Sequence, residues 1–205
     1  MPNLDYETAA RARLGQGTII AGVDEVGRGP WAGPVTACAV ILDPMNIPDG
    51  LNDSKKLSAK RREALAAEIL SSAQVSIAHA SVAEIDRLNI LKASMLAMRR
   101  AVEGLPQAPQ FALIDGNRIP ADLPCLAEAV IKGDSKSASI AAASIVAKVT
   151  RDEIMVALAQ QFPGYGWEKN AGYGTKLHQA GLQNLGVTTH HRRSFKPIHN
   201  ILCEE

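Results

Sequence analysis

Five short apolar runs recur along the chain, each bounded by glycine, proline or polar residues. They cover residues 18–24, 35–42, 74–81, 111–115 and 127–133. These runs are rich in β-branched residues and too short for typical helices, so they are typical of β-strands. The pattern predicts about five strands, of which the first two are adjacent in the chain.

Longer stretches separate the strands and are predicted to be helices: residues 5–14, 58–70, 90–103, 137–161 and 175–185. Ser58 is suited to cap the second of them. Helices that alternate with strands indicate an α/β fold, with a mixed central sheet flanked by helices. We expect residues 1–162 to form the main domain and residues 163–205 to form a helical C-terminal part.

The composition is that of a folded protein, with 46% hydrophobic residues, and it gives no overall excess of positive charge. There are 22 Lys and Arg against 21 Asp and Glu, a formal net charge of +1. The C-terminal part is more basic, since residues 165–199 hold one acid, Glu168, against five basic residues: Lys169, Lys176, Arg192, Arg193 and Lys196. This stretch is either a solvated tail or a surface for a polyanion.

Cysteine usage and the N-terminal sequence bear on the cellular compartment. The three cysteines have neither disulfide-like nor ligand-like spacing, which suits a reducing compartment. No apolar stretch of signal-peptide type begins the chain, and the segment ASIAAASIVAKV is too short to span a bilayer. We therefore expect a cytoplasmic protein without a membrane partner.

Acidic residues stand at the ends of three predicted strands. Asp24 and Glu25 follow the first, Asp115 ends the fourth, and Asp134 follows the fifth. The carboxyl ends of strands line the functional crevice of open α/β sheets, so these side chains are expected to meet. Clustered carboxylates repel one another unless a cation joins them, and oxygen ligands favour Mg²⁺ or Mn²⁺. The alternative is that they are ordinary acids at strand ends.

A glycine-rich loop, GRGPWAGP at residues 27–34, directly follows the first acid pair. Its GxGxxxG spacing, and the strand after it, exclude the dinucleotide-binding fingerprint, which needs GxGxxG before a helix. Glycines allow a backbone to turn sharply and approach a ligand closely. The loop is either a bare turn or the rim of the predicted metal site.

Six motifs occur in one order along the chain: GVDEVGRGPWAGPV, LNDSKKLS, LIDGN, IKGDSKSASIAAASIVAKVTRD, AGYGTK and HHRRSFKP. Together they resemble the type 2 ribonuclease H family over about residues 18–197. The last motif is similar to that of its bacterial ribonuclease HII members. Val26, Trp31 and Leu177 depart from the residues usual in the family, and none of them is a predicted metal ligand.

The resemblance implies an RNase H-like catalytic domain, and it implies roles for particular residues. A quartet of catalytic, metal-binding acids would be Asp24, Glu25, Asp115 and Asp134. The backbone of Gly27, Arg28 and Gly29 would read the ribose 2′-hydroxyl, which distinguishes RNA from DNA. Tyr173 would pack on the deoxyribose that follows the ribonucleotide, although an isolated tyrosine in such a turn can also be structural.

Further basic residues are candidates for contacts with the phosphate backbone. Lys55 and Lys56 are expected to hold phosphates, with a solvated loop as the alternative, and the basic C-terminal segment to track the duplex. His190, His191 and Arg192 lack ligand spacing relative to the acids. They are therefore assigned to backbone binding or to structure.

The predicted reaction is hydrolysis on the 5′ side of a ribonucleotide by a two-metal mechanism, which leaves 3′-hydroxyl and 5′-phosphate ends. The expected partners are RNA–DNA hybrid duplexes and DNA that contains ribonucleotides. We expect a monomer without an organic cofactor. The alternatives are an inactive nucleic-acid binding module, disfavoured because all four acids are present, and another two-metal nuclease of the same fold. A nuclease of the latter kind would not need a loop that reads the 2′-hydroxyl.

Overall fold

A five-stranded mixed sheet forms the centre of the computed structural model, which describes residues 1–204. The strand order is β3-β2-β1-β4-β5. The strands are β1 (Ile20–Val26), β2 (Val35–Ile41), β3 (Gln74–Ala80), β4 (Phe111–Asp115) and β5 (Leu126–Val130). β1, β2 and β3 pair antiparallel, whereas β4 and β5 run parallel to β1. The predicted α/β class and the five strands are confirmed.

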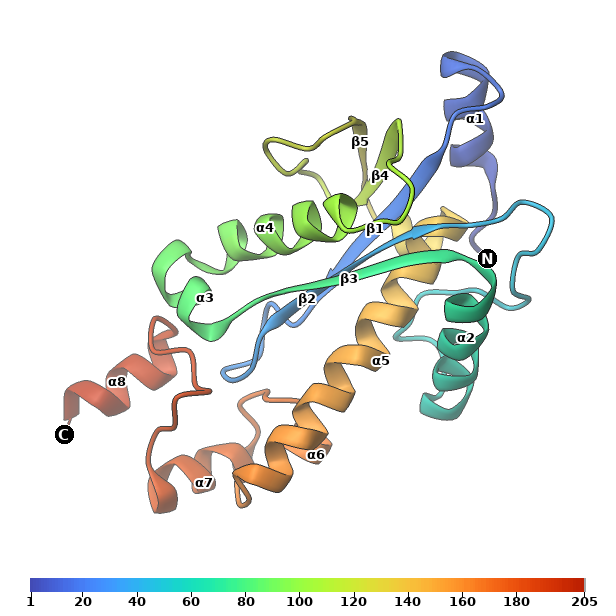
Figure 1. Cartoon of the computed structure of the whole chain (residues 1–205). Coiled ribbons are helices and arrows are strands. Elements are labelled where there is room, and N and C mark those ends of the chain that lie inside the picture. The colour runs from blue at the N-terminus through green and yellow to red at the C-terminus, as the bar shows by residue number, and fades with distance from the viewer. Residues whose placement is uncertain (205) are drawn as a thin grey trace.

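Helices cover both faces of this sheet (Figure 1). One face packs against α4 (Ile90–Glu103), which follows the short α3 (Val82–Leu88). The other packs against α2 (Ala59–Ser72) and the long α5 (Ala138–Gln161), while α1 (Asp5–Leu14) lies near the start of β1. Gly22 lets α5 lie directly on β1, because a Cβ there would overlap the backbone of Ser139. The centre of the sheet is consequently buried on both sides.

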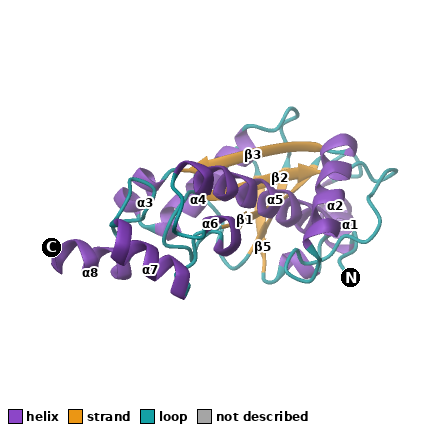
Figure 2. Ribbon diagram, turned by 90° about the horizontal axis from the view of Figure 1, so that it is seen from below, coloured by secondary structure: helices purple, strands orange, loops and turns teal. Residues whose placement is uncertain are grey.

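The C-terminal part extends beyond one end of the sheet (Figures 1 and 2). It contains α6 (Trp167–Asn170), α7 (Lys176–Leu185) and α8 (Lys196–Glu204). Its own small core joins Trp167, Leu182 and Ile198 to Met155 of α5 and to Ala32 of the glycine-rich loop. The loop and the C-terminal part are therefore packed as one unit.

Some predicted boundaries are wrong. β1 continues to Val26, because Glu25 and Val26 pair with Ala37 and Thr36 of β2, so the first acid pair lies within the strand. β5 ends at Val130, and Asp134 lies in a separate 3₁₀ turn, Gly133–Ser135. The left-handed backbone of Lys132, at φ 56°, separates that turn from the strand.

Three short helices, α3, α6 and α8, were not predicted. α3 begins with a capping box, in which the Ser81 hydroxyl accepts the Glu84 N–H and the Glu84 carboxylate accepts the Ser81 N–H. That pairing is the local signal that identifies its start. None of the helices between residues 1 and 204 is both long and apolar enough to cross a lipid bilayer.

Candidate active site

Asp24 and Asp115 lie side by side at the carboxyl ends of the parallel strands β1 and β4. The register pairs Val23 with Ile114, so the next residues on both strands are neighbours. Asp24 is buried, and its Oδ1 accepts the Glu25 N–H at 2.7 Å. Burial, reinforced by the charges of Glu25 and Asp115, raises the pKa of Asp24 well above its ordinary value. These two carboxylates are thus an unfavourable pair in the absence of a cation.

Glu25 projects from the opposite face of the sheet, because successive residues of a strand alternate. It lines a hollow of about 230 Å³ together with Arg28, Met95 and Asp115. Arg28 Nη1 lies 3.4 Å from Glu25 Oε1. Burial raises the pKa of Glu25 to about 7; Arg28 opposes the shift and Asp115 adds to it. The carboxylates of Glu25 and Asp115 therefore repel each other at the end of the sheet.

Asp134 reaches the same region from the 3₁₀ turn after β5. The turn is joined to β4 by Asp115, whose Oδ1 accepts the Gly133 N–H at 2.6 Å. Burial, followed by the charges of Asp115 and Asp53, raises the pKa of Asp134. Lys55 Nζ lies 3.8 Å from Asp134 Oδ2 and is the nearest cation to that carboxylate. All four predicted acids thus lie near the carboxyl ends of β1, β4 and β5.

The donor chemistry of these four residues fits a hard divalent ion, since every donor is a carboxylate oxygen. However, no three Asp, Glu, His or Cys side chains among residues 1–204 are already arranged around a single point. Strand alternation explains this in part, because Glu25 leaves the sheet on the side opposite Asp24. Mg²⁺ is commonly held by one or two carboxylates, with waters and substrate phosphates completing its shell. An open arrangement of this kind is compatible with such binding.

The Gly27-Arg28-Gly29 loop lies next to the acids, and its carbonyl groups point inward. Arg192 donates to the Gly27 carbonyl at 2.6 Å and to the Arg28 carbonyl at 3.0 Å. Gly27 has φ +95°, and a Cβ there would overlap the guanidinium of Arg151. Internal packing and the positive φ therefore both require glycine at this position.

Tyr173 lies directly beside this loop and is 48% exposed. A Cβ on Gly29 would lie 3.2 Å from Tyr173 Cε1, so the ring borders Gly29 closely. Behind the ring, the Tyr173 carbonyl lies 3.0 Å from His178 Nδ1. The loop and the tyrosine, predicted from distant motifs, are neighbours in the structure.

The two predicted lysines differ in their surroundings. Lys55 is exposed and faces the acids; although burial opposes its charge, the carboxylates of Asp134 and Asp53 raise its pKa. Lys56 is also exposed, on the same loop. A role in phosphate binding stays a prediction for both.

Arg192 of the basic C-terminal segment is fully buried, as are His178 and His191. Of the two roles expected for Arg192 and His191, backbone binding or structure, this burial favours structure. Sequence analysis does not single out Arg151, which is buried in α5. It belongs to a series spaced by four residues with Ala147, Met155 and Ala159, which are also buried, so its position on this apolar stripe is the signal in the sequence. A charged residue at such a position is unusual and needs a partner.

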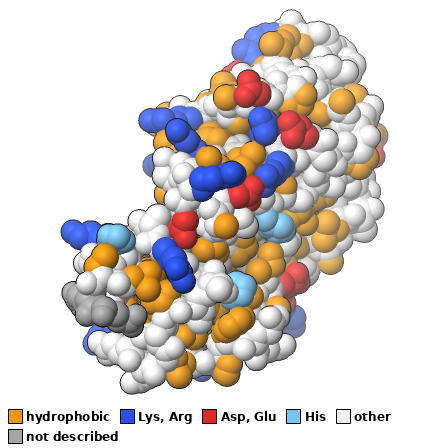
Figure 3. All heavy atoms as spheres, turned by 60° about the vertical axis from the view of Figure 1, so that its left-hand side comes forward, with side chains coloured by type: hydrophobic (Ala, Val, Ile, Leu, Met, Phe, Trp, Pro, Cys, Tyr) orange, Lys and Arg blue, Asp and Glu red, His pale blue; other side chains and the backbone are white. Residues whose placement is uncertain are grey.

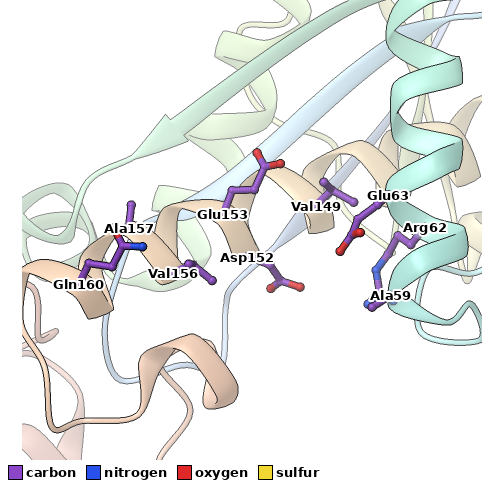
Figure 4. Close-up of a pocket in the computed structure, with 9 residues that line it drawn as sticks. All are labelled: Ala59, Arg62, Glu63, Val149, Asp152, Glu153, Val156, Ala157 and Gln160. Carbon is purple, nitrogen blue, oxygen red and sulfur yellow. The ribbon is translucent and has the colours of Figure 1, made fainter.

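Neither the general surface charge nor the other hollows identify the site. Lys and Arg side chains are interspersed with Asp and Glu on the face shown in Figure 3, without one continuous basic patch. A hollow of about 320 Å³ lies between α2 and α5, lined among others by Glu63, Asp152 and Val156 (Figure 4). It contains none of the four acids, so the carboxyl ends of the strands remain the candidate site.

Comparison with known sequences shows the family. A model of ribonuclease HII matches residues 21–198, which include all four acids, the glycine-rich loop and Tyr173. The chain belongs to the ribonuclease HII family. It is accordingly an enzyme, an endoribonuclease of the ribonuclease H type that acts on RNA–DNA hybrids.

Bacterial ribonuclease HII proteins are similar over the whole chain. The one from Ruegeria pomeroyi is 68% identical, covering 100% of this chain and 88% of its own. The one from Paracoccus denitrificans is 61% identical over 98% of this chain and 96% of its own. The bacterial resemblance expected from the motifs is confirmed.

Solved structures of ribonucleases H2 and HII have the same fold. Ribonuclease H2 from Pyrococcus horikoshii aligns with a TM-score of 0.74 and 26% identity, covering 90% of this chain and 97% of that chain. An RNase HII from Archaeoglobus fulgidus, solved in a complex with PCNA, aligns with a TM-score of 0.75 and 28% identity, covering 87% and 95%. The RNase H-like architecture is confirmed.

Proposed function

We propose that this ribonuclease HII cuts duplex DNA at single embedded ribonucleotides as well as within RNA–DNA hybrids. The cut falls on the 5′ side of the ribonucleotide and leaves 3′-hydroxyl and 5′-phosphate ends. The observation that carries the proposal is the contact of Tyr173 with Gly29, next to Arg28, which reaches Glu25. The loop and Tyr173, which would bind one ribose and the deoxyribose that follows it, would thus lie next to the acids.

Asp24, Glu25, Asp115 and Asp134 would hold Mg²⁺ or Mn²⁺ in a two-metal arrangement. The raised pKa values of Asp24, Glu25 and Asp134 support this, because they record the cost of burying these carboxylates without a cation. Bound divalent ions supply Lewis-acid stabilisation of the phosphate and a nucleophilic water. A neighbour of the same fold, RNase HIII from Bst, was solved in complex with Mn²⁺.

The remaining residues bind and orient the substrate. The backbone of Gly27, Arg28 and Gly29 contacts the 2′-hydroxyl, and Tyr173 provides an apolar ring for the following sugar. Lys55 and Lys56 neutralise phosphates near the acids. Because no side chain is required as a nucleophile, no covalent intermediate forms.

The two alternatives are less well supported. An inactive binding module would not need three buried or half-buried acids with raised pKa values near the carboxyl ends of neighbouring strands. Another two-metal nuclease would not need the Gly29–Tyr173 contact beside them.

We further propose that the protein acts as a monomer in the cytoplasm. Its free cysteines, Cys38, Cys125 and Cys203, suit a reducing compartment. Size-exclusion chromatography with light scattering tests the monomer.

The experiment that tests the function compares three duplexes of one sequence: DNA with one ribonucleotide, a continuous RNA–DNA hybrid, and DNA alone. We expect cleavage of the first two in Mg²⁺ and none of the third. Cleavage of the hybrid alone would contradict the proposed action on single ribonucleotides.

A further inference from the structure

Two buried arginines lie beneath the glycine-rich loop. Arg151 of α5 and Arg192, between α7 and α8, are 1% and 0% exposed. Among the described residues, neither guanidinium forms an ion pair. A buried charge without a carboxylate is costly unless polar groups satisfy it.

Backbone carbonyls satisfy both guanidinium groups. Arg192 donates to the carbonyls of Gly27, Arg28, Gly33 and Pro34, at 2.6 to 3.2 Å. Arg151 donates to those of Ala32, Pro34 and Ala171, at 2.9 to 3.1 Å. The two arginines thus share the Pro34 carbonyl and hold most of the loop from within.

The same contacts join the loop to the turn that carries Tyr173. Ala171, two residues before the tyrosine, has a left-handed backbone with φ 48°, and its carbonyl accepts from Arg151. The Trp31 N–H also donates to the Gly172 carbonyl at 2.8 Å. Because Ala32 pairs with His191, the segment that carries Arg192 belongs to the same assembly.

We infer that Arg151 and Arg192 are positioning residues, which hold the Gly27-Arg28-Gly29 loop and Tyr173 at a fixed separation and thereby set the preference for a ribonucleotide–DNA junction. This inference rests on the proposed function. The two arginines act through the backbone of the loop and of the Tyr173 turn, and they do not touch the substrate. Their forked donors matter more than their charge, since one guanidinium bridges carbonyls of separate segments.

Lysine variants distinguish the role of the planar guanidinium donors from the role of the positive charge. In Arg192→Lys and Arg151→Lys a cation is kept but the planar set of donors is lost. Arg100→Lys is the control, because Arg100 of α4 also uses its forked donors, on Glu84, but donates no hydrogen bond to the loop or to the Tyr173 turn. For each variant, kcat and KM are measured on the single-ribonucleotide duplex and on the continuous hybrid, over a range of salt concentrations.

The expected result is at least a tenfold fall in the ratio of kcat/KM for the junction to kcat/KM for the hybrid, in both lysine variants. The dependence of KM on salt should stay that of the wild type, and Arg100→Lys should keep the wild-type ratio. An unchanged ratio in Arg192→Lys and Arg151→Lys would overturn the inference. A weaker salt dependence at constant ratio would also overturn it, because the charge would then act on phosphates.

Hydrogen exchange of the wild type provides a test that needs no variant. Within the segments 31–33 and 171–174, the amides of Trp31, Gly33, Gly172 and Tyr173 donate hydrogen bonds and should already be protected in the free protein, because the assembly is rigid before substrate binds. Rapid exchange of these segments, slowed only by a single-ribonucleotide duplex, would overturn the inference even if the variants do not fold. A wild type that cuts hybrids but not single ribonucleotides would contradict the proposed function alone, and exchange would still test the rigidity.

Discussion

The Nε2 atoms of His178 and His191 lie 3.0 Å apart in the core of the C-terminal part. The His191 Nδ1 accepts the Thr188 N–H, so the proton of a neutral His191 is on Nε2 and is donated to His178. His178 Nε2 also accepts from Trp167 Nε1, so its own proton is on Nδ1, which donates to the Tyr173 carbonyl. Both rings are therefore neutral, and the chain of donors ends at the turn that carries Tyr173.

Protonation of His191 would place two donors against each other, so stability should depend on pH. Burial, followed by repulsion from His178 and His190, lowers the pKa of His191 from 6.5 to about 3. As pH falls, the unfolded chain binds this proton before the folded protein does. The stability that depends on a neutral His191 is therefore fully present above pH 6.5 and is lost as pH falls toward 3. At pH 5 the loss is about 2 kcal/mol.

Chemical denaturation of wild type and His191→Gln at pH 7 and pH 5 measures this effect. The variant should lose less stability than the wild type over that interval, because glutamine does not titrate. His199→Gln is the matched control, since His199 is exposed on α8. Equal pH dependence in all three proteins would show that His191 is not held neutral by the core.

Replacing Asp24 with Asn should abolish cleavage and stabilise the protein in the absence of metal. By analogy with the loss of one oxyanion-hole donor, the loss of one metal ligand should cost at least about 10²–10³-fold in rate. Because the pKa of Asp24 in the folded protein is raised above its ordinary value of 3.8, the unfolded chain releases this proton first, and stability is lost as pH rises from 3.8 through the folded pKa. Asn removes this cost, so the stability gain should increase with pH.

The measurement is turnover in Mg²⁺ together with the free energy of unfolding in chelator, from pH 5 to pH 8. Asp122→Asn serves as the control, because Asp122 is an exposed loop acid away from the four. Near wild-type turnover of Asp24→Asn would remove this residue from the site.

Tyr173→Ala should impair the junction substrate more than the continuous hybrid. It removes the ring beside Gly29, with an expected cost of about 1–3 kcal/mol by analogy with base–aromatic stacking. Tyr173→Phe keeps the ring and should stay close to wild type. Rates on both substrates at fixed salt provide the comparison, and equal losses on both in Tyr173→Ala would mean that the tyrosine is only structural.

Much of the fold follows from local sequence, because the apolar runs that form strands are separated by well-marked turns. The end of β1 does not, since the pairing of Glu25 with Ala37 depends on the register between strands. The sequence pattern predicts Asp134 directly after the fifth strand, whereas the left-handed Lys132 separates it from β5. Where a strand ends depends on its pairing with neighbouring strands, and the sequence of that strand alone does not show this pairing.

The sequence predicts the residues of the candidate site, but it does not predict the buried arginines that hold the loop in place. The motifs predict the acids, the loop and Tyr173 as site residues, and these residues lie near one another in the structure. Arg151 and Arg192 bind carbonyls more than 100 residues away in sequence, at Pro34 and Gly27, and no local pattern specifies such partners. The indication that the sequence offers is the position of Arg151 on a stripe of α5 whose other members are apolar.

Mapping the cut in a duplex DNA with one ribonucleotide tests the central claim most directly. With end-labelled strands, Mg²⁺ and single-nucleotide resolution, we predict one cut on the 5′ side of the ribonucleotide, with 3′-hydroxyl and 5′-phosphate ends. Excess chelator should abolish it, and added Mg²⁺ or Mn²⁺ should restore it. No cut in this duplex, or a metal-independent cut that leaves a 2′,3′-cyclic phosphate, would contradict the account, because the latter product requires attack by the 2′-hydroxyl itself.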